Sequence, residues 1–499
     1  MTVFFSCLLA TVAAAFAAYD WLHFFQQTHY RPNGAFWRAA QLRPVRLNFV
    51  LGVCGTAAGC FGWYWSVPFW VASVGNTLFY RRKTKLKFTK RLCRLYAAVV
   101  CGAALGNLWV CGVAVPLVPL AVCVAWAVML PLESGISLFY VQKAKRKLNR
   151  SACLKIAVVG SYAKTTVKTF LAEMLGGTYR VCATPNSYNT PLGIARTVNK
   201  KWRPTDEILI AEFGARRKGD IRTLTKLYSP DLLVYTGLAA CHLQTFGSME
   251  GVRCAKYEAV QYAKSTAVAF FQLQDDSLLP LYRKCPLKKV AVKQQAAAET
   301  TDGVTRFTLR YGGEIVPLQT TLLGSHQLQN VALAAAVAEW MHVPKEQLQK
   351  AVVNLRPAPH RLEATFQNGL WIIDDSFNAN EKGVRAAMDA IRSFEGRKYV
   401  VTPGVVEQGR ATQAANEAFA AELSLADGIV LCGPNEAFLR SGLQKAGYDG
   451  LILSAATPQQ AVELLQPYFR TGDVLLFEND LPESFESRSR FHRKGRIQK

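Results

Sequence analysis

The segment from Gly160 to Thr166 contains the residue types that bind phosphate. It reads Gly-Ser-Tyr-Ala-Lys-Thr-Thr, follows the short apolar run LKIAVV at 154–159, and precedes a helical pattern. In a strand–turn–helix, backbone N–H groups at the helix N-terminus and a lysine ammonium, here Lys164, face the anion. The hydroxyl directly after the lysine, Thr165, can ligate Mg²⁺. Alone, however, the segment also fits an ordinary strand-to-helix turn with a surface lysine.

One position departs from the strict pattern G-x-x-x-x-G-K-[ST], because Ala163 stands where a glycine would precede the lysine. If this position requires a positive φ, alanine costs about 1 kcal/mol there. Such a cost strains the loop without necessarily abolishing phosphate binding.

The elements around this segment alternate between strands and helices. Short apolar runs at 154–159, 208–211 and 232–236 are separated by helical patterns, which predicts a mostly parallel α/β sheet. Residues 288–322 instead predict several short strands with a hairpin turn at Gly312-Gly313, and 326–341 predicts a helix. A second alternation, from about 361 to 482, predicts a smaller α/β domain.

The first 150 residues have a different composition. The chain has 499 residues and a net charge of +24, which both a nucleic-acid protein and a membrane protein can show. Residues 1–150 hold 17 Lys and Arg but only two acids, and three stretches there have no charged residue: 1–19, 47–80 and 95–132. A membrane-spanning helix needs about 20 apolar residues. We therefore expect four spans, or five if the second stretch crosses twice, with Pro116 and Pro119 near the middle of a hairpin in the third.

The basic segments predict the orientation of these spans. Residues 81–94 hold eight Lys and Arg and residues 143–150 hold five, and the predicted hairpin between them returns the chain to the same side. The positive-inside rule makes that side cytoplasmic. Nucleic-acid binding by these runs is the alternative, and anionic lipid at the membrane surface is the simpler account.

The motifs after residue 150 resemble, in order, those of the Mur ligase family, the ATP-dependent amide ligases of peptidoglycan synthesis. The branch most similar is the one that adds D-alanyl-D-alanine to the muramoyl peptide. The resemblance runs from about 157 to 409 and includes these segments: 160–166, Asn186 to Gly193, Ala211 to Asp220, Ala240 to Ser248, Ala255 to Glu258, Ser325 to Asn330, His360 to Glu363, and Asp374 to Asn380.

The resemblance implies roles for individual residues. It implies that ATP is bound by the following residues: Gly160, Ser161, Ala163, Lys164, Thr165, Thr166, Asn330, Arg361 and Asp375. It implies that Mg²⁺ is bound by Thr165, Glu212, His242 and Lys256, the last as a carbamate. Lys164, His242, Lys256 and Arg361 are implied to serve catalysis, which proceeds through an acyl phosphate formed by γ-phosphoryl transfer. Each also has an ordinary alternative, such as an ion-paired Glu212 or a merely solvated Lys256.

Together these patterns predict an α-helical transmembrane domain at 1–150, a P-loop-type α/β central domain at 151–360, a Rossmann-like α/β domain at 361–485 and a basic tail at 486–499. The expected location is the cell membrane, multi-pass, with cytoplasmic catalytic domains. Pathway Mur ligases have a soluble UDP-binding domain where this chain has its apolar stretches. The acceptor is therefore expected to be a UDP-linked or a lipid-linked muramoyl peptide, and the amine an amino acid or dipeptide. One alternative is a non-catalytic ATP-binding scaffold or switch. Another is an ATP-coupled transporter, and the small number of ionisable residues in the spans argues against it.

Overall fold

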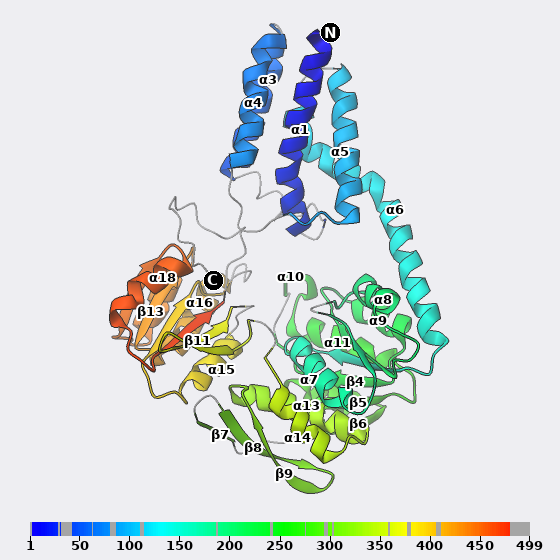
Figure 1. Cartoon of the computed structure of the whole chain (residues 1–499), viewed down its shortest axis with the longest axis vertical. Helices are drawn as coiled ribbons and strands as arrows, with labels where there is room; N and C mark the ends of the chain where they lie inside the picture. Colours follow the sequence, from blue (N-terminus) through cyan, green and yellow to red (C-terminus); the bar gives the residue numbers. More distant parts are fainter. Residues whose placement is uncertain are drawn as a thin grey trace. The chain divides into compact units, whose positions relative to one another are not determined.

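The structure is a computed structural model, and its parts are shown in Figure 1. It describes residues 2–27, 30, 42–61, 63–79, 86–109, 114–185, 188–239, 243–274, 276–293, 298–301, 304–357, 360–376, 381–405 and 411–479. Contacts divide the chain into one unit that ends at Leu138 and a second that begins at Phe139.

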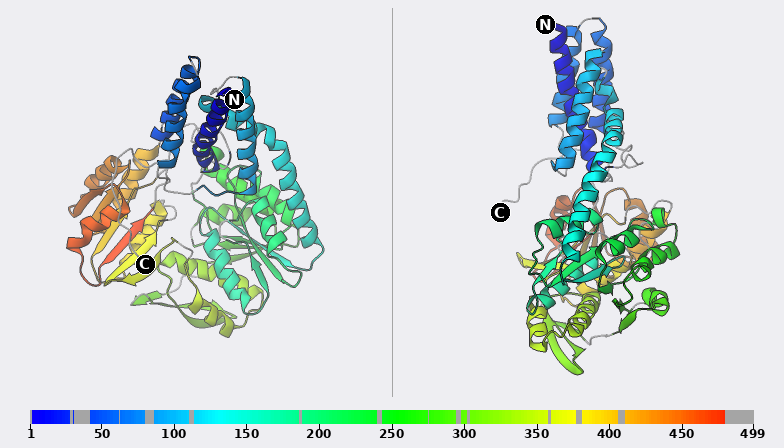
Figure 2. Two further views of the ribbon diagram at one scale, coloured as in Figure 1. Left: turned by 45° about the horizontal axis from the view of Figure 1, so that its top comes forward. Right: turned by 90° about the vertical axis from the view of Figure 1, so that its right-hand side faces the viewer.

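The first unit is helical. Its helices are α1 (Thr2–Gln27), α3 (Arg43–Gly59), α4 (Trp63–Phe79), α5 (Lys90–Trp109) and the first part of α6 (Ala114–Asn149). Helix α1 packs against α4 and α5, and α3 packs against α4, so the helices run alongside one another in both views of Figure 2. Three segments in the described part of the chain are long and apolar enough to cross a membrane: Phe4–Gln26, Lys90–Trp109 and Ala114–Asn149.

The other two helices show how the ambiguous second apolar stretch folds. Helices α3 and α4 have 17 residues each, somewhat short of the roughly 20 that cross a bilayer. The third stretch forms two helices as expected, but the position of its break was predicted wrongly. Pro116 and Pro119 lie within α6, which begins at Ala114, and residues 110–113 lie outside the described residues.

A buried polar cluster joins three of these helices. The Asn48 amide on α3 donates to Asp20 Oδ2 on α1 at 3.1 Å and to Thr77 Oγ1 on α4 at 2.9 Å. The Thr77 hydroxyl in turn donates to Asp20 Oδ2 at 3.0 Å. Polar side chains that bond across helices compensate for the small hydrophobic driving force between apolar helices in lipid.

Helix α6 belongs to both units. Its last residues, including Val141, Ala144 and Leu148, are buried in the same hydrophobic core as the helices of the α/β unit. The Asn199 amide donates to Tyr140 O at 2.9 Å and fixes this contact. Helix α6 therefore contributes residues 114–138 to the first unit and residues 139–149 to the second.

The second unit begins with a six-stranded parallel sheet in the order β2-β3-β1-β4-β5-β6. The strands are β1 (Leu154–Val159), β2 (Val181–Ala183), β3 (Ile208–Phe213), β4 (Leu232–Tyr235), β5 (Val268–Gln272) and β6 (Lys288–Val292). Helices cover both faces, as Figure 1 shows, which is why alternate residues of β1 enter two different cores. One face carries α7 (Lys164–Gly176), α13 (Ser325–Trp340) and α14 (Lys345–Asn354), and the other α8 (Pro191–Lys200), α9 (Asp220–Tyr228), α11 (Met249–Gln261) and α12 (Leu279–Lys284).

A small antiparallel sheet packs beside α14. It consists of β7 (Ala298–Thr301), β8 (Val304–Tyr311) and β9 (Glu314–Thr320). The turn between β8 and β9 is Gly312-Gly313, with φ values of +61° and +84°, which confirms the predicted hairpin.

A second six-stranded sheet follows in the order β10-β11-β15-β12-β13-β14. It is parallel apart from the edge strand β10, as a Rossmann-like domain would be. Its strands are β10 (Glu363–Gln367), β11 (Leu370–Asp375), β12 (Lys398–Thr402), β13 (Gly428–Cys432), β14 (Leu451–Ala455) and β15 (Val474–Glu478), and its helices are α15 (Glu381–Ile391), α16 (Thr412–Glu422), α17 (Glu436–Lys445) and α18 (Pro458–Leu465).

Candidate functional site

The loop after β1 is held against the end of β4. Ser161 N–H donates to Gly237 O at 2.8 Å, and the Thr236 hydroxyl donates to Tyr162 O at 2.5 Å. Gly160 lies so close to β4 that a Cβ there would be 2.0 Å from Thr236 Oγ1. The glycine is therefore required by the close approach of the loop to the strand.

Ala163, which stands where the strict pattern has a glycine, has the positive φ that would favour glycine. Its φ is +56° and its ψ is 1°, in the left-handed region, directly before the first residue of α7. The cost of about 1 kcal/mol that a positive φ imposes on alanine therefore applies to Ala163.

Lys164 and Ser161 lie at the start of α7, where a helix has N–H groups without intrahelical acceptors. Lys164 Nζ donates to Ser161 O at 3.1 Å, which folds the ammonium back over the loop. Ser161 Oγ is buried and has no hydrogen-bond partner among the described residues. A buried hydroxyl without a partner is costly, and an anion in the loop would supply an acceptor for it.

The structure brings Thr165 and Glu212 together. Parallel pairing of β1 with β3 places Glu212 beside Val158, close to the phosphate loop. The Thr165 hydroxyl donates to Glu212 Oε2 at 2.7 Å, and the Asn189 amide donates to Glu212 Oε1 at 3.1 Å. Glu212 is only 2% exposed. These oxygen donors are the type that Mg²⁺ prefers, so the residues fit the metal that the resemblance implies.

Lys168, which the sequence analysis missed, is the cation nearest to this carboxylate. Its Nζ lies 3.8 Å from Glu212 Oε2, and both side chains are buried. Burial lowers the pKa of Lys168, and the charge of Glu212 raises it. Lys168 follows Lys164 by four residues and so lies on the same face of α7, but its burial beside Glu212 depends on the packing of α7 against β3.

Of the two other predicted metal ligands, Lys256 and His242, the structure describes Lys256. Lys256 lies on α11 and is 2% exposed, and its carbonyl accepts a hydrogen bond from the Tyr235 hydroxyl at 3.0 Å. His242 lies outside the described residues. In the described ranges, no group of three or more His, Cys, Asp and Glu side chains is arranged as a metal site.

The start of α13 also has polar atoms that lack partners. Asn330 is 6% exposed, and His326 Nδ1 and Gln327 Oε1 are buried without a hydrogen-bond partner among the residues described. Burial lowers the pKa of His326 to about 4, so the ring is neutral at pH 7. Neutral donors and acceptors of this kind suit a nucleobase, which has no charge to pair.

Arg361 lies between two strained residues. His360 and Leu362 have φ values of +61° and +50°, and Leu362 N–H donates to Asp375 Oδ1 at 3.2 Å. Burial lowers the pKa of Arg361, while the charges of Asp375 and Glu212 raise it. Positive φ at non-glycine residues is a strain that is concentrated at functional sites.

Asp375 has a neighbour that the sequence analysis missed. Parallel pairing of β11 with β15 places Glu478 beside it, and Glu478 is fully buried. Burial raises the pKa of Asp375 to about 6 and raises that of Glu478 well above its usual range, with the charge of Asp375 adding to the effect on Glu478. Two carboxyl groups so close cannot both ionise at little cost.

Comparison with known proteins agrees with this architecture. The family model "Mur ligase middle domain" matches residues 158–338, and "Mur ligase, glutamate ligase domain" matches residues 360–478. The UDP-N-acetylmuramoyl-tripeptide–D-alanyl-D-alanine ligase of Bacillus subtilis (strain 168) is 28% identical over 348 residues, 68% of this chain and 75% of that protein. That of Mycobacterium tuberculosis (strain ATCC 25618 / H37Rv) is 30% identical over 246 residues, 47% of this chain and 48% of that protein.

Solved structures show the same fold. The MurF ligase of Thermotoga maritima, in complex with ADP, superposes with a TM-score of 0.60 at 24% identity and covers 69% of this chain and 80% of that one. The folylpolyglutamate synthase of Mycobacterium tuberculosis superposes with a TM-score of 0.54 at 15% identity, over 72% and 97% of the two chains.

A phosphate loop with a facing carboxylate, on a parallel sheet followed by a second α/β domain, defines an ATP-dependent ligase. The chain belongs to the Mur ligase family. Its α/β domains follow an N-terminal helical region with apolar helices.

Proposed function

We propose that this protein is a membrane-anchored, ATP-dependent ligase of peptidoglycan synthesis that extends a muramoyl-peptide acceptor through an acyl phosphate. The observation that carries the proposal is the contact between Thr165 and Glu212, because it joins the phosphate loop to a buried carboxylate within a Mur ligase fold. The named relatives form an amide with D-alanyl-D-alanine, and that dipeptide is the amine we propose here.

The chain's own residues would bind and position the reactants. The N-terminus of α7 and Lys164 neutralise the β- and γ-phosphates, and the Ser161 hydroxyl donates to a phosphate oxygen. Gly160, Ala163 and Thr166 shape the loop, while Asn330 and Asp375 orient the nucleoside. Arg361 holds the transferring phosphoryl group in line with the acceptor carboxylate.

The reaction proposed is chemically balanced. The acceptor carboxylate oxygen attacks the γ-phosphorus and ADP leaves, which gives the acyl phosphate. The amine nitrogen then attacks the acyl carbon, inorganic phosphate leaves, and the nitrogen loses a proton as the amide forms.

Magnesium fits the donor set and would be held by Thr165 and Glu212, with a second ion at His242 and a carbamoylated Lys256. Bound there, the ions would neutralise charge that develops on the phosphoryl oxygens. Carbamoylation converts the Lys256 ammonium into an anion. The side chain is 2% exposed, so either charged form needs a partner of opposite charge, and a metal ion would be that partner for the carbamate.

Membrane anchoring follows from the apolar helices. Three segments are long and apolar enough to span a bilayer, and α6 carries four Lys and Arg in its last turns, with Arg150 directly after it. Its basic end would face the cytoplasm together with the catalytic domains. An anchored enzyme meets lipid-linked precursors at the membrane surface, so we propose a lipid-linked acceptor ahead of a UDP-linked one.

Phosphate release distinguishes these acceptors. The purified full chain would be incubated with ATP, D-alanyl-D-alanine and either acceptor, with Lys164→Ala as the matched control. Turnover with the lipid-linked acceptor that is lost in Lys164→Ala supports the proposal, and turnover only with the UDP-linked form refutes the lipid-linked part of it.

A second candidate is a non-catalytic membrane scaffold that binds ATP. Ala163 favours it, because a strained loop residue persists where a glycine would be unstrained. ATP binding without phosphate release in the presence of any muramoyl acceptor would establish this alternative.

A further inference from the structure

A basic cavity lies on the α/β unit among α9, α11 and α12. It has a volume of about 610 Å³, within the range of small-molecule sites. Four cationic side chains line it: Lys218, Arg222, Arg253 and Lys284. Two acids, Glu250 and Glu258, also line it, so its walls carry a net charge of +2.

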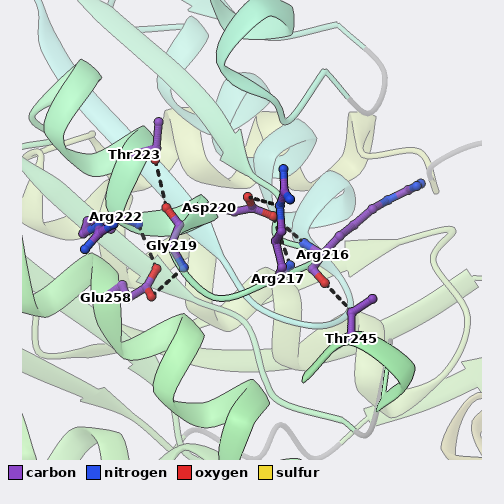
Figure 3. A network of polar contacts seen from close by, with 8 residues as sticks. All are labelled: Arg216, Arg217, Gly219, Asp220, Arg222, Thr223, Thr245 and Glu258. Atoms are coloured by element: carbon purple, nitrogen blue, oxygen red, sulfur yellow. Dashed lines mark hydrogen bonds and ion pairs between the residues drawn. The ribbon is translucent and has the colours of Figure 1, made fainter. Parts of the chain in front are cut away.

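The two acids are already engaged by the protein. Glu258 accepts from Gly219 N–H at 2.8 Å and from Arg222 N–H at 3.0 Å, as Figure 3 shows. Glu250 forms an ion pair with Arg253. The carboxylates therefore serve to fix the walls and leave half of the positive charge uncompensated.

Three of the cations have no carboxylate partner within the described part of the chain: Lys218, Arg222 and Lys284. They come from three separate elements, which the protein holds in place. Tyr257 on α11 donates to the Lys284 carbonyl at 2.9 Å, and Gly219 has a φ of +93° that only glycine adopts without strain. Like charges gathered around a cavity repel one another, and a bound anion would offset that repulsion.

We propose that this cavity binds a diphosphate group, as a second anion site apart from the nucleotide site. A diphosphate matches the net charge of the walls and offers acceptors for a bidentate arginine and for lysines on either side. Two sources share this chemistry: the diphosphate of a UDP- or lipid-linked acceptor, and a free nucleotide. The choice of the acceptor as a source rests on the proposed function, while the site itself does not.

The network in Figure 3 joins one wall of this cavity to the loop before α9. Glu258 lies two residues after Lys256 on α11, and it holds the start of α9, which follows the strand end that carries Glu212. Thr245, from α10 (Leu243–Phe246), also donates to the carbonyl of Arg216 in this loop. An anion bound in the cavity would thus meet a wall made from the same elements as the predicted metal ligands.

The exposed thiol of Cys254 provides a direct probe, because it lines the cavity. The full chain in detergent, saturated with ADP to fill the nucleotide site, would be alkylated with iodoacetamide, with and without inorganic pyrophosphate. Mass spectrometry would follow Cys254, with the exposed cysteines Cys60 and Cys93 at helix ends of the helical unit as internal controls.

Pyrophosphate should slow alkylation of Cys254 several-fold and leave the controls unchanged. In Arg222→Gln/Lys284→Gln, about a hundredfold more pyrophosphate should be needed, at about tenfold for each lost charged contact. Lys226→Gln is the matched control, because Lys226 is an exposed cation of α9 that lies over the Tyr262 ring and does not line the cavity.

Two results would overturn the inference: no protection of Cys254 by pyrophosphate, or equal protection in the double variant. Repeating the experiment with UDP-linked acceptor, lipid-linked acceptor or free ATP identifies the source of the diphosphate. Ligase turnover is measured separately, so intact turnover without protection of Cys254 would reject this site and leave the proposed function standing.

Discussion

Replacing Ala163 with glycine should stabilise the protein. Ala163 has a φ of +56°, and the left-handed conformation costs an L-residue with a Cβ about 1–2 kcal/mol. Glycine removes that cost but loses about 0.4–1 kcal/mol more chain entropy on folding. The net gain is therefore between about 0 and 1.6 kcal/mol, and its midpoint of about 0.8 kcal/mol corresponds to a rise in Tm of roughly 2–3 °C for a domain of this size.

The same substitution elsewhere on the helix provides the control. Ala172 lies within α7 with helical geometry, so Ala172→Gly should destabilise the protein by about 0.5–1 kcal/mol. Both variants of the full chain would be compared with wild type by thermal unfolding in detergent, without nucleotide and then with ATP. A fall in Tm for Ala163→Gly as large as that for Ala172→Gly would refute the assignment of strain to Ala163.

Three further predictions concern packing and titration. Gly160→Ala should weaken ATP binding and lower Tm, because its Cβ would lie 2.0 Å from Thr236 Oγ1. Nucleotide titration and thermal melting measure both effects. An unchanged ATP affinity and an unchanged Tm would contradict the close approach of the loop to Thr236. The pKa of Glu478 is raised in the folded protein, so its carboxyl group favours folding at low pH and this contribution is lost as pH rises. Glu478→Gln should therefore raise Tm at pH 8 more than at pH 5. An equal change in Tm at the two pH values would count against this reasoning. Leu148→Asp should lower Tm and expose the end of α6 to protease by placing a charge in the core, whereas Lys143→Asp on the exposed face of the same helix should leave both unchanged.

The sequence predicted the elements of the fold better than their contacts. The β-branched run before Gly160 and the Gly-Gly turn at 312–313 each fix a local conformation, and the structure confirms both. The partners of Glu212 depended on which strands lie side by side. The order β2-β3-β1-β4 is a property of the whole sheet, so local pattern could not show that β3 brings Glu212 to Thr165.

The missed residues illustrate the same limit. Lys168 reads as a solvated helix lysine until the tertiary fold buries it beside Glu212. Glu478 ends an apolar run, and only the parallel pairing of β11 with β15 places it against Asp375. In both cases the chemistry arises from a pairing of distant segments, which residue spacing along one segment does not encode.

Helix α8 lies between the end of α6 and the candidate site. Its apolar face, with Ile194 and Val198, lies in the same core as Leu148 of α6. Directly before its N-terminus, Asn189 donates to Glu212. Because a packed core transmits displacement where a flexible linker would absorb it, movement of the end of α6 must be accommodated by α8 and hence by the partner of the predicted metal ligand.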